Sequence, residues 1–268
     1  LVRIQKALGG FTADDFAAEV YGRAVLDMMR DGRGIYQILR LMHQVGVLGR
    51  IFPEFEAIRC RVIRDFFHKY TVDEHSLIAI RNIEHLGAES GSRNARRGLK
   101  AILGEMESPE LLRLALLLHD IGKSVQHHEG DHVSSSTEEV DAVLARVGLE
   151  HAQQEIVRVV IRNHLEMSKI ILRRDITDPN VVAQFAELVE TTENLRMLCL
   201  LTYADMKAVS PEVLTTWKED LLWQLYVETY NHLLHGFADD RYVQGEDLEI
   251  EINEILGFVS FQVSVDDV

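Results

Sequence analysis

The stretch LLRLALLLHDIGK, residues 111–123, organises the interpretation of the whole sequence. Arg113 is its only polar residue before His119, so the segment is apolar around its circumference and is predicted to be a buried central helix. The helix runs into the pair His119-Asp120. Burying an imidazole and a carboxylate together is costly unless they are hydrogen-bonded or coordinate a metal. The pair therefore predicts either a neutral histidine held by a carboxylate or a metal site.

The composition is that of a globular protein of 268 residues, 47% of them hydrophobic. The 28 basic and 43 acidic residues give a net charge of −15, which argues against a nucleic-acid footprint or an anionic membrane surface as partner. No apolar stretch approaches the ~20 residues that cross a bilayer, and no signal-peptide pattern opens the chain, so a cytoplasmic location is expected. A short basic stretch is predicted to be a solvated helix face: Arg93, Arg96, Arg97 and Lys100.

The two cysteines and the first residue also carry information. Cys60 and Cys199 lie far apart without CxxC spacing, so they are expected to be packed thiols and neither a disulfide framework nor a zinc knuckle. The chain begins with Leu, which indicates part of a longer, multidomain polypeptide.

Helical signals cover most of the chain, and the predicted fold class is all-α. One helix is expected to end at residues 31–32, and a second, over 35–45, to stop at Gly46. Thr71 and Glu74 form a capping box that starts a helix. Residues 87–98 are predicted to be a loop. Further helices are expected at about 137–147, 153–171, 179–190, 195–208 and 211–235, and residues 258–265 as a strand or an extended end.

Three more candidate metal ligands fall on faces that their helices should bury. His164 follows Val160 by four positions, Asp205 follows Leu201 by four, and His75 lies in the first turn of its helix. A lone inward histidine or aspartate is commonly a hydrogen-bonded core residue, but five such groups on four helices favour a shared site. Imidazole and carboxylate ligands suit Mn, Fe, Zn or Co, and the absence of thiolates argues against structural zinc.

The order His75, His119-Asp120, Asp205 resembles the H…HD…D signature of the HD-domain metal-dependent phosphohydrolases. A closer resemblance, over about residues 30–235, is to bacterial PII uridylyltransferases, whose HD domain hydrolyses a UMP–tyrosine phosphodiester on the PII signalling protein. It is carried by ILRLMHQVGVLGRIFPEF (38–55), DFFHKYTVDEHSL (65–77), LLLHDIGK (116–123), GDH (130–132), IRNHLEMS (161–168), RRDITDP (173–179) and LTYADMKAVSPE (201–212).

The resemblance implies an HD-domain helical bundle with extra N-terminal helices. A helical segment packed on the core is expected at 1–60, the HD phosphohydrolase domain at 61–236 and a C-terminal extension at 237–268. The Asp-x-Asp motif of the family's nucleotidyltransferase domain is missing from this sequence.

One or two divalent cations (Mn, Fe, Zn, Co or Mg) are implied as cofactors. The first would be held by His75, His119, Asp120 and Asp205, and the second by His132 and His164 with Asp120 as bridge. Where the family continues GDHSELGA, this chain has GDHVSSST after a histidine-rich loop, so His127 or His128 can replace His132 as ligand. Lys123 is a candidate phosphate contact beside Asp120, or a solvated loop lysine.

The function implied is hydrolysis of a nucleotide phosphoester by metal-activated water, with Asp120 and Lys123 as catalytic groups. The leading substrate is a nucleotidylated protein, namely a uridylylated PII-like signalling protein that loses UMP. The alternatives are an HD hydrolase of free nucleotides, a regulatory HD module that binds metal or nucleotide without turnover, and a catalytically inactive helical interaction domain.

Overall fold

The structure is a computed structural model, and it describes residues 10–11, 14–16, 19–62, 69–86, 91–124, 132–210 and 212–240. The regular structure within these ranges is entirely helical, which confirms the all-α fold. The elements are η1 (Asp14–Phe16), α2 (Glu19–Asp31), α3 (Ile35–Val45), α4 (Leu48–Ile51), α5 (Pro53–Ala57), α6 (Val72–Glu84), α7 (Arg93–Gly104), α8 (Pro109–Leu118), η2 (Ile121–Ser124), α9 (His132–Arg146), α10 (His151–Arg162), α11 (Glu166–Arg173), α12 (Pro179–Val189), α13 (Thr192–Val209) and α14 (Thr216–Asp240).

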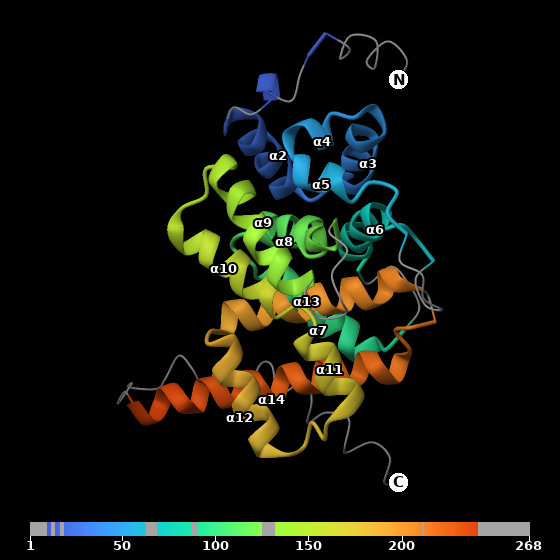
Figure 1. The fold of residues 1–268 in the computed structure, drawn as a ribbon. Coiled ribbons are helices and arrows are strands. Elements are labelled where there is room, and N and C mark those ends of the chain that lie inside the picture. Colours follow the sequence, from blue (N-terminus) through green and yellow to red (C-terminus); the bar gives the residue numbers. More distant parts are fainter. Residues whose placement is uncertain are drawn as a thin grey trace.

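Figure 1 shows these helices in three tiers. Helices α2 to α5 form the upper tier, α6, α8, α9 and α10 lie below them, and α11, α12 and the long α14 form the lower tier. Helix α13 runs between the middle and lower tiers and packs on α6, α8 and α14. Within the described part of the chain, no helix is both long and apolar enough to cross a bilayer.

Helix α8 is the predicted central helix. Proline at its first position, Pro109, has the fixed φ that suits a helix start. Every residue from Glu110 to Leu118 is buried, and the helix packs on α2, α6, α10 and α13. Nη1 of its one basic residue, Arg113, donates a 2.6 Å hydrogen bond to the carbonyl of Met29. The helix ends at Leu118, so the polar pair that follows lies inside the core.

The N-terminal helices end where the sequence predicts. Helix α2 ends at Asp31, and α3 spans Ile35–Val45. Gly46 follows α3 with a φ of 81°, and its N–H bonds back to the carbonyl of His43. Glycine tolerates this left-handed conformation without the Cβ clash that other residues suffer.

Two predicted helix boundaries are wrong, and Cys60, expected to be a packed thiol, is exposed. The single helix expected over 153–171 is two helices, α10 and α11, separated by a turn at residues 163–165. The turn contains no glycine or proline; instead the ring of His164 hydrogen-bonds the carbonyl of Ile161, a local bond that competes with the helix ladder. The loop expected over 87–98 gives way to α7 from Arg93 onward, and the predicted strand or extended end at 258–265 lies outside the described residues.

The basic stretch on α7 is only partly solvated. Arg93, Arg97 and Lys100 are exposed as expected. Arg96 is buried, contrary to the prediction, because its guanidinium forms two hydrogen bonds to Glu219 of α14. A guanidinium with a bidentate carboxylate partner tolerates burial that an unpaired one does not.

Candidate metal centre

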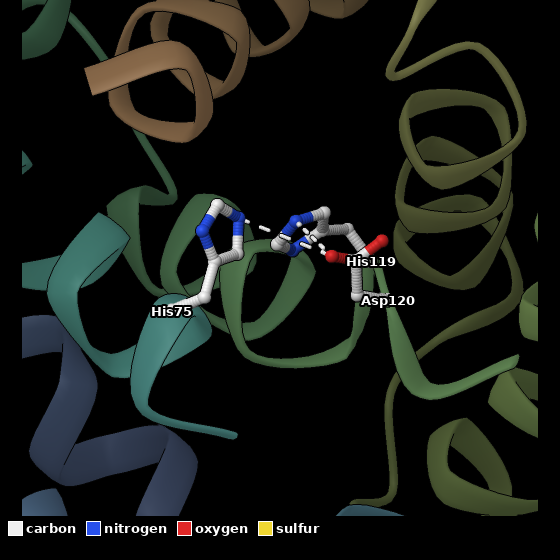
Figure 2. Close-up of side chains that lie close together, drawn as sticks. All are labelled: His75, His119 and Asp120. Carbon is white, nitrogen blue, oxygen red and sulfur yellow. Dashed lines mark ion pairs between the residues drawn. The ribbon is translucent and has the colours of Figure 1, made fainter. Parts of the chain in front are cut away.

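Helices α6, α8 and α13 bring a cluster of imidazoles and carboxylates together inside the core. His75 lies in the first turn of α6, His119 and Asp120 follow α8 directly, and Asp205 lies near the end of α13. One ligand atom from each of His75, His119 and Asp120 lies within 4.8 Å of the other two. Figure 2 shows these three side chains, with both imidazoles directed toward the Asp120 carboxylate. The three residues are no more than 3% exposed.

Helix α6 is fixed against α13 by a residue that sequence reasoning missed. The buried side-chain amide of Asn82 donates a 3.1 Å hydrogen bond to the carbonyl of Ala204, the residue before Asp205. Asn82 lies one turn beyond the apolar Ile78 on the buried face of α6. This inward polar position was the available signal. The bond is one of the contacts that hold α6 against α13 next to Asp205.

The contacts in the centre are short. His75 Nε2 lies 2.8 Å from Asp205 Oδ1 and 3.9 Å from Asp120 Oδ2. His119 Nε2 lies 3.3 Å from Asp120 Oδ2 and 3.7 Å from Asp205 Oδ1. Both imidazoles therefore present Nε2 to the same pair of carboxylates.

His119 carries the clearest sign of a missing partner. Its Nδ1 lies 2.9 Å from the carbonyl of Leu116, and because a carbonyl only accepts hydrogen bonds, Nδ1 must carry a hydrogen. Its buried Nε2 makes no hydrogen bond within the described residues, and neither does Oδ1 of Asp120. Buried polar atoms normally have partners. An imidazole held by a carbonyl at Nδ1 and open at Nε2 is arranged as a metal ligand, so the donor set fits a divalent cation.

His164 approaches Asp120 from the other side. Its Nδ1 lies 2.7 Å from the carbonyl of Ile161, and its Nε2 lies 3.9 Å from Asp120 Oδ1. Asp120 therefore turns Oδ2 toward His75 and His119 and Oδ1 toward His164. The sequence correctly predicts that His164 is inward, but its position is a turn between two helices and not a helix face.

The remaining predicted site residues divide into described and undescribed ones. Lys123, in η2, lies with Nζ 2.6 Å from Asp120 Oδ2 and is largely buried, so the solvated loop lysine considered above is wrong. His132 is the first residue of α9, but its side chain is outside the described part. His127 and His128 lie outside the described residues altogether.

The buried charged groups of the centre shift one another's pKa values. Burial disfavours a charged His119, but the carboxylates of Asp120 and Asp205 outweigh it and raise the pKa of His119 to about 10. Burial also disfavours ionised carboxylates, yet Lys123 and His119 keep the pKa of Asp120 well below its usual range, and His119 and His75 do the same for Asp205. Burial, and next the charge on His119, lower the pKa of His164 to about 4. The two carboxylates thus require positive charge at this point.

Two surface hollows lie away from this cluster. One, of about 700 Å³, runs along α4 and α5 and is lined by residues that include Arg50 and Pro53. The other, of about 300 Å³, lies between α12 and α14 beside Pro179 and His232. Neither hollow is lined by a residue of the cluster.

Comparison with known proteins places this cluster in a family. The HD domain family matches residues 72–205, which is half of the chain and runs from the start of α6 to Asp205. The chain belongs to the HD domain family. This HD domain has the expected signature residues at both ends of the matched span and at the end of its central helix. Membership agrees with the enzyme class expected from the sequence, a metal-dependent phosphohydrolase.

Similar proteins are longer enzymes with two named activities. The chain is 38% identical to a bifunctional uridylyltransferase/uridylyl-removing enzyme of Chromobacterium violaceum over 83% of its own length and 26% of that protein. It is 38% identical to the protein of the same name from Caulobacter vibrioides over 77% of its length and 22% of that protein. It is 35% identical to the protein of the same name from Nitrosococcus oceani over 91% of its own length and 27% of that protein. The chain thus spans about a quarter of the curated relatives it matches.

Proposed function

We propose that this HD domain hydrolyses a nucleotide phosphoester with a divalent cation held by His75, His119, Asp120 and Asp205. The observation that carries the proposal is the buried, mutually close set of ligand atoms in which His119 Nε2 and Asp120 Oδ1 have no hydrogen-bond partner among the described residues. A scaffold gains little from burying such atoms. A cation would provide the positive charge that a proton on His119 otherwise supplies.

The side chains have separate proposed roles. A divalent cation bound here would activate water for attack on phosphorus and neutralise charge on the phosphoryl oxygens. His119 is held in one tautomer by Leu116, so its Nε2 stays aimed at the site. Lys123, in contact with Asp120, is placed to meet a phosphoryl oxygen of the substrate.

A second cation is proposed on the other face of Asp120. The support is that Asp120 Oδ1 lies 3.9 Å from His164 Nε2, on the side away from His75. His132 would complete this second set, with His127 and His128 as the alternatives. Mn, Fe, Zn, Co and Mg are all compatible with imidazole and carboxylate ligands in such a pair of sites.

The substrate we propose is a uridylylated protein of the PII type. Its support is the uridylyl-removing activity named for the relatives, together with the stretches that resemble PII uridylyltransferases. In the proposed reaction a water oxygen bonds to phosphorus, the bond between phosphorus and the tyrosine oxygen breaks, and UMP and the tyrosine hydroxyl are released. One proton of the water passes to the tyrosine oxygen and the other to solvent. We also propose that the HD domain spans residues 61–236, between an N-terminal helical segment and a C-terminal extension. The chain is proposed to be part of a multidomain protein.

The test offers three substrates to the purified chain: uridylylated PII, a panel of free nucleotides and an aryl phosphodiester, each with and without Mn²⁺. Asp120→Ala is the inactive comparison, and Glu187→Ala, an exposed carboxylate of α12, is the matched control. Metal-dependent release of UMP from PII by wild type and Glu187→Ala, but not by Asp120→Ala, is expected. Turnover of free nucleotides alone would overturn the PII substrate, and no turnover by metal-loaded chain would leave a regulatory HD module.

A further inference from the structure

Helices α3 and α6 are fastened to each other at both ends by side chains. At one end, His43 in the last turn of α3 lies with Nε2 2.8 Å from Asp73 Oδ2 in the first turn of α6. At the other end, Glu84 in the last turn of α6 accepts hydrogen bonds from the backbone N–H groups of Ile35 and Tyr36, the first residues of α3. The two helices are therefore antiparallel, and their relative height is set at two points.

The first turn of α6 has no cap of its own. Thr71 is the N-cap residue, as the capping box predicts, but its side chain makes no cap hydrogen bond. The N–H of Val72 donates to the carbonyl of Arg61 at 2.9 Å. A helix start leaves backbone N–H groups without partners inside the helix, and for α6 the carbonyl of Arg61 supplies one such partner from outside.

The His43–Asp73 contact is the buried centre of these restraints. Both residues are at most 6% exposed. The ring of His43 packs edge-on against the fully buried Phe55 of α5, with centroids 5.3 Å apart. Helix α3 thus supplies His43 to the carboxylate of Asp73, and α5 packs Phe55 against the same His43 ring.

His75 lies two residues after Asp73, in the same helical turn. A shift of that turn moves His75 Nε2 directly, because no flexible segment separates the two residues. Metal sites tolerate ligand displacements of only about 0.2 Å to 0.5 Å. The 2.8 Å contact between His75 and Asp205 of α13 therefore depends on where α3 holds α6.

We propose that the His43–Asp73 pair positions His75 for metal binding, so that α3 is part of the support of the metal centre. This role rests on the proposed metal-binding function. His43 and Asp73 are positioning residues, since neither is among the proposed ligands. Glu84 offers a matched control: it joins the same two helices but lies nine residues beyond His75, about 13 Å along the helix.

The experiment measures Co²⁺ binding by the full chain through its visible spectrum, alongside thermal unfolding of the metal-free chain. His43→Leu removes the contact with Asp73 and is expected to weaken Co²⁺ affinity about tenfold and to alter the cobalt spectrum. His43→Gln can still donate an amide hydrogen bond to Asp73 and should restore the affinity to within about twofold. Glu84→Ala should lower the unfolding temperature but leave the affinity within about twofold of wild type.

The outcomes separate the positioning role from general stability. Affinity losses that follow the unfolding temperature in all three variants, or wild-type affinity in His43→Leu, would overturn the positioning role while the metal site stands. Absence of Co²⁺ binding by the wild-type chain would overturn the proposed metal site itself, and the positioning role of His43 and Asp73 would fall with it. If His43→Leu does not fold, Asp73→Leu has a similar side-chain shape but cannot accept the hydrogen bond from His43, and it is expected to weaken the affinity in the same way.

Discussion

Two buried charged clusters in this molecule differ in how their charges are balanced. Between α7 and α14, Glu219 accepts hydrogen bonds from Nη2 and Nε of Arg96 at 2.7 Å and 3.1 Å, and from the N–H of Ser92 at 2.7 Å. One cation meets one anion there. In the candidate metal centre, two carboxylates, Asp120 and Asp205, lie next to the imidazoles of several histidines.

The difference indicates which buried charges serve the fold and which await a ligand. The charges of Arg96 and Glu219 cancel, and the carboxylate is bonded from two sides. The centre around Asp120 balances its carboxylates with Lys123 and with the imidazoles of His75 and His119, and despite burial the carboxylates raise the pKa of His119 to about 10. Loss of a cation should therefore change the second cluster and leave the first intact.

The largest expected effect is on turnover. Asp120→Ala removes the carboxylate that faces both proposed cation positions, and should abolish metal binding and lower the hydrolysis rate by about 10³-fold or more. Metal content by mass spectrometry and initial rates check this. Full metal occupancy in the variant would show that Asp120 is not a ligand.

Arg96→Met should produce the largest loss of stability without touching the centre. Removing one partner of a buried ion pair leaves Glu219 uncompensated and is expected to cost about 3 kcal/mol of the free energy of unfolding. Arg97→Met, an exposed neighbour on the same helix, should change stability by less than about 0.5 kcal/mol. Both variants should keep wild-type metal stoichiometry when folded. Loss of metal in folded Arg96→Met would mean that the two clusters are coupled.

Metal affinity should rise with pH. Burial opposes the charge on His119, but Asp120 and Asp205 outweigh it, so His119 is protonated below a pKa of about 10 and a cation must displace that proton. The affinity is expected to increase about tenfold per pH unit between about pH 6.5 and 8.5, with release of about one proton. Calorimetry in two buffers of different ionisation enthalpy measures the proton directly. Binding without proton release would contradict the charge balance described for the centre.

The smallest predicted change is a factor of two in stoichiometry. His164 Nε2 lies 3.9 Å from Oδ1 of Asp120, so His164→Ala should remove the second cation and spare the first. Metal analysis should fall from about two ions per chain to one. Loss of both ions, or of neither, would indicate a single-cation centre or a purely structural His164.

The sequence predicts the centre well because its residues obey local periodicity. The unbroken apolar run over 111–118 marks the central helix, and the inward places of His75 and Asp205 follow from their spacing to apolar neighbours. The HD signature then adds a family that the comparisons confirm.

What the sequence does not reveal depends on contacts between distant segments. Arg96 looks solvated until Glu219, 123 positions away, is packed against it. Asp73 likewise shows its role only beside His43, which lies 30 positions earlier. The break at residues 163–165 contains no glycine or proline, so the strongest local signals of a helix end are missing there.

The most direct test of the account is a crystal structure of the metal-loaded chain with anomalous scattering measured at the edge of the bound metal. We expect an anomalous peak within coordination distance of the four proposed ligands, His75, His119, Asp120 and Asp205. Any second peak should lie between Asp120 and His164. A metal bound elsewhere, or loaded protein with no peak at this cluster, would contradict the central claim that these buried residues form a cation site.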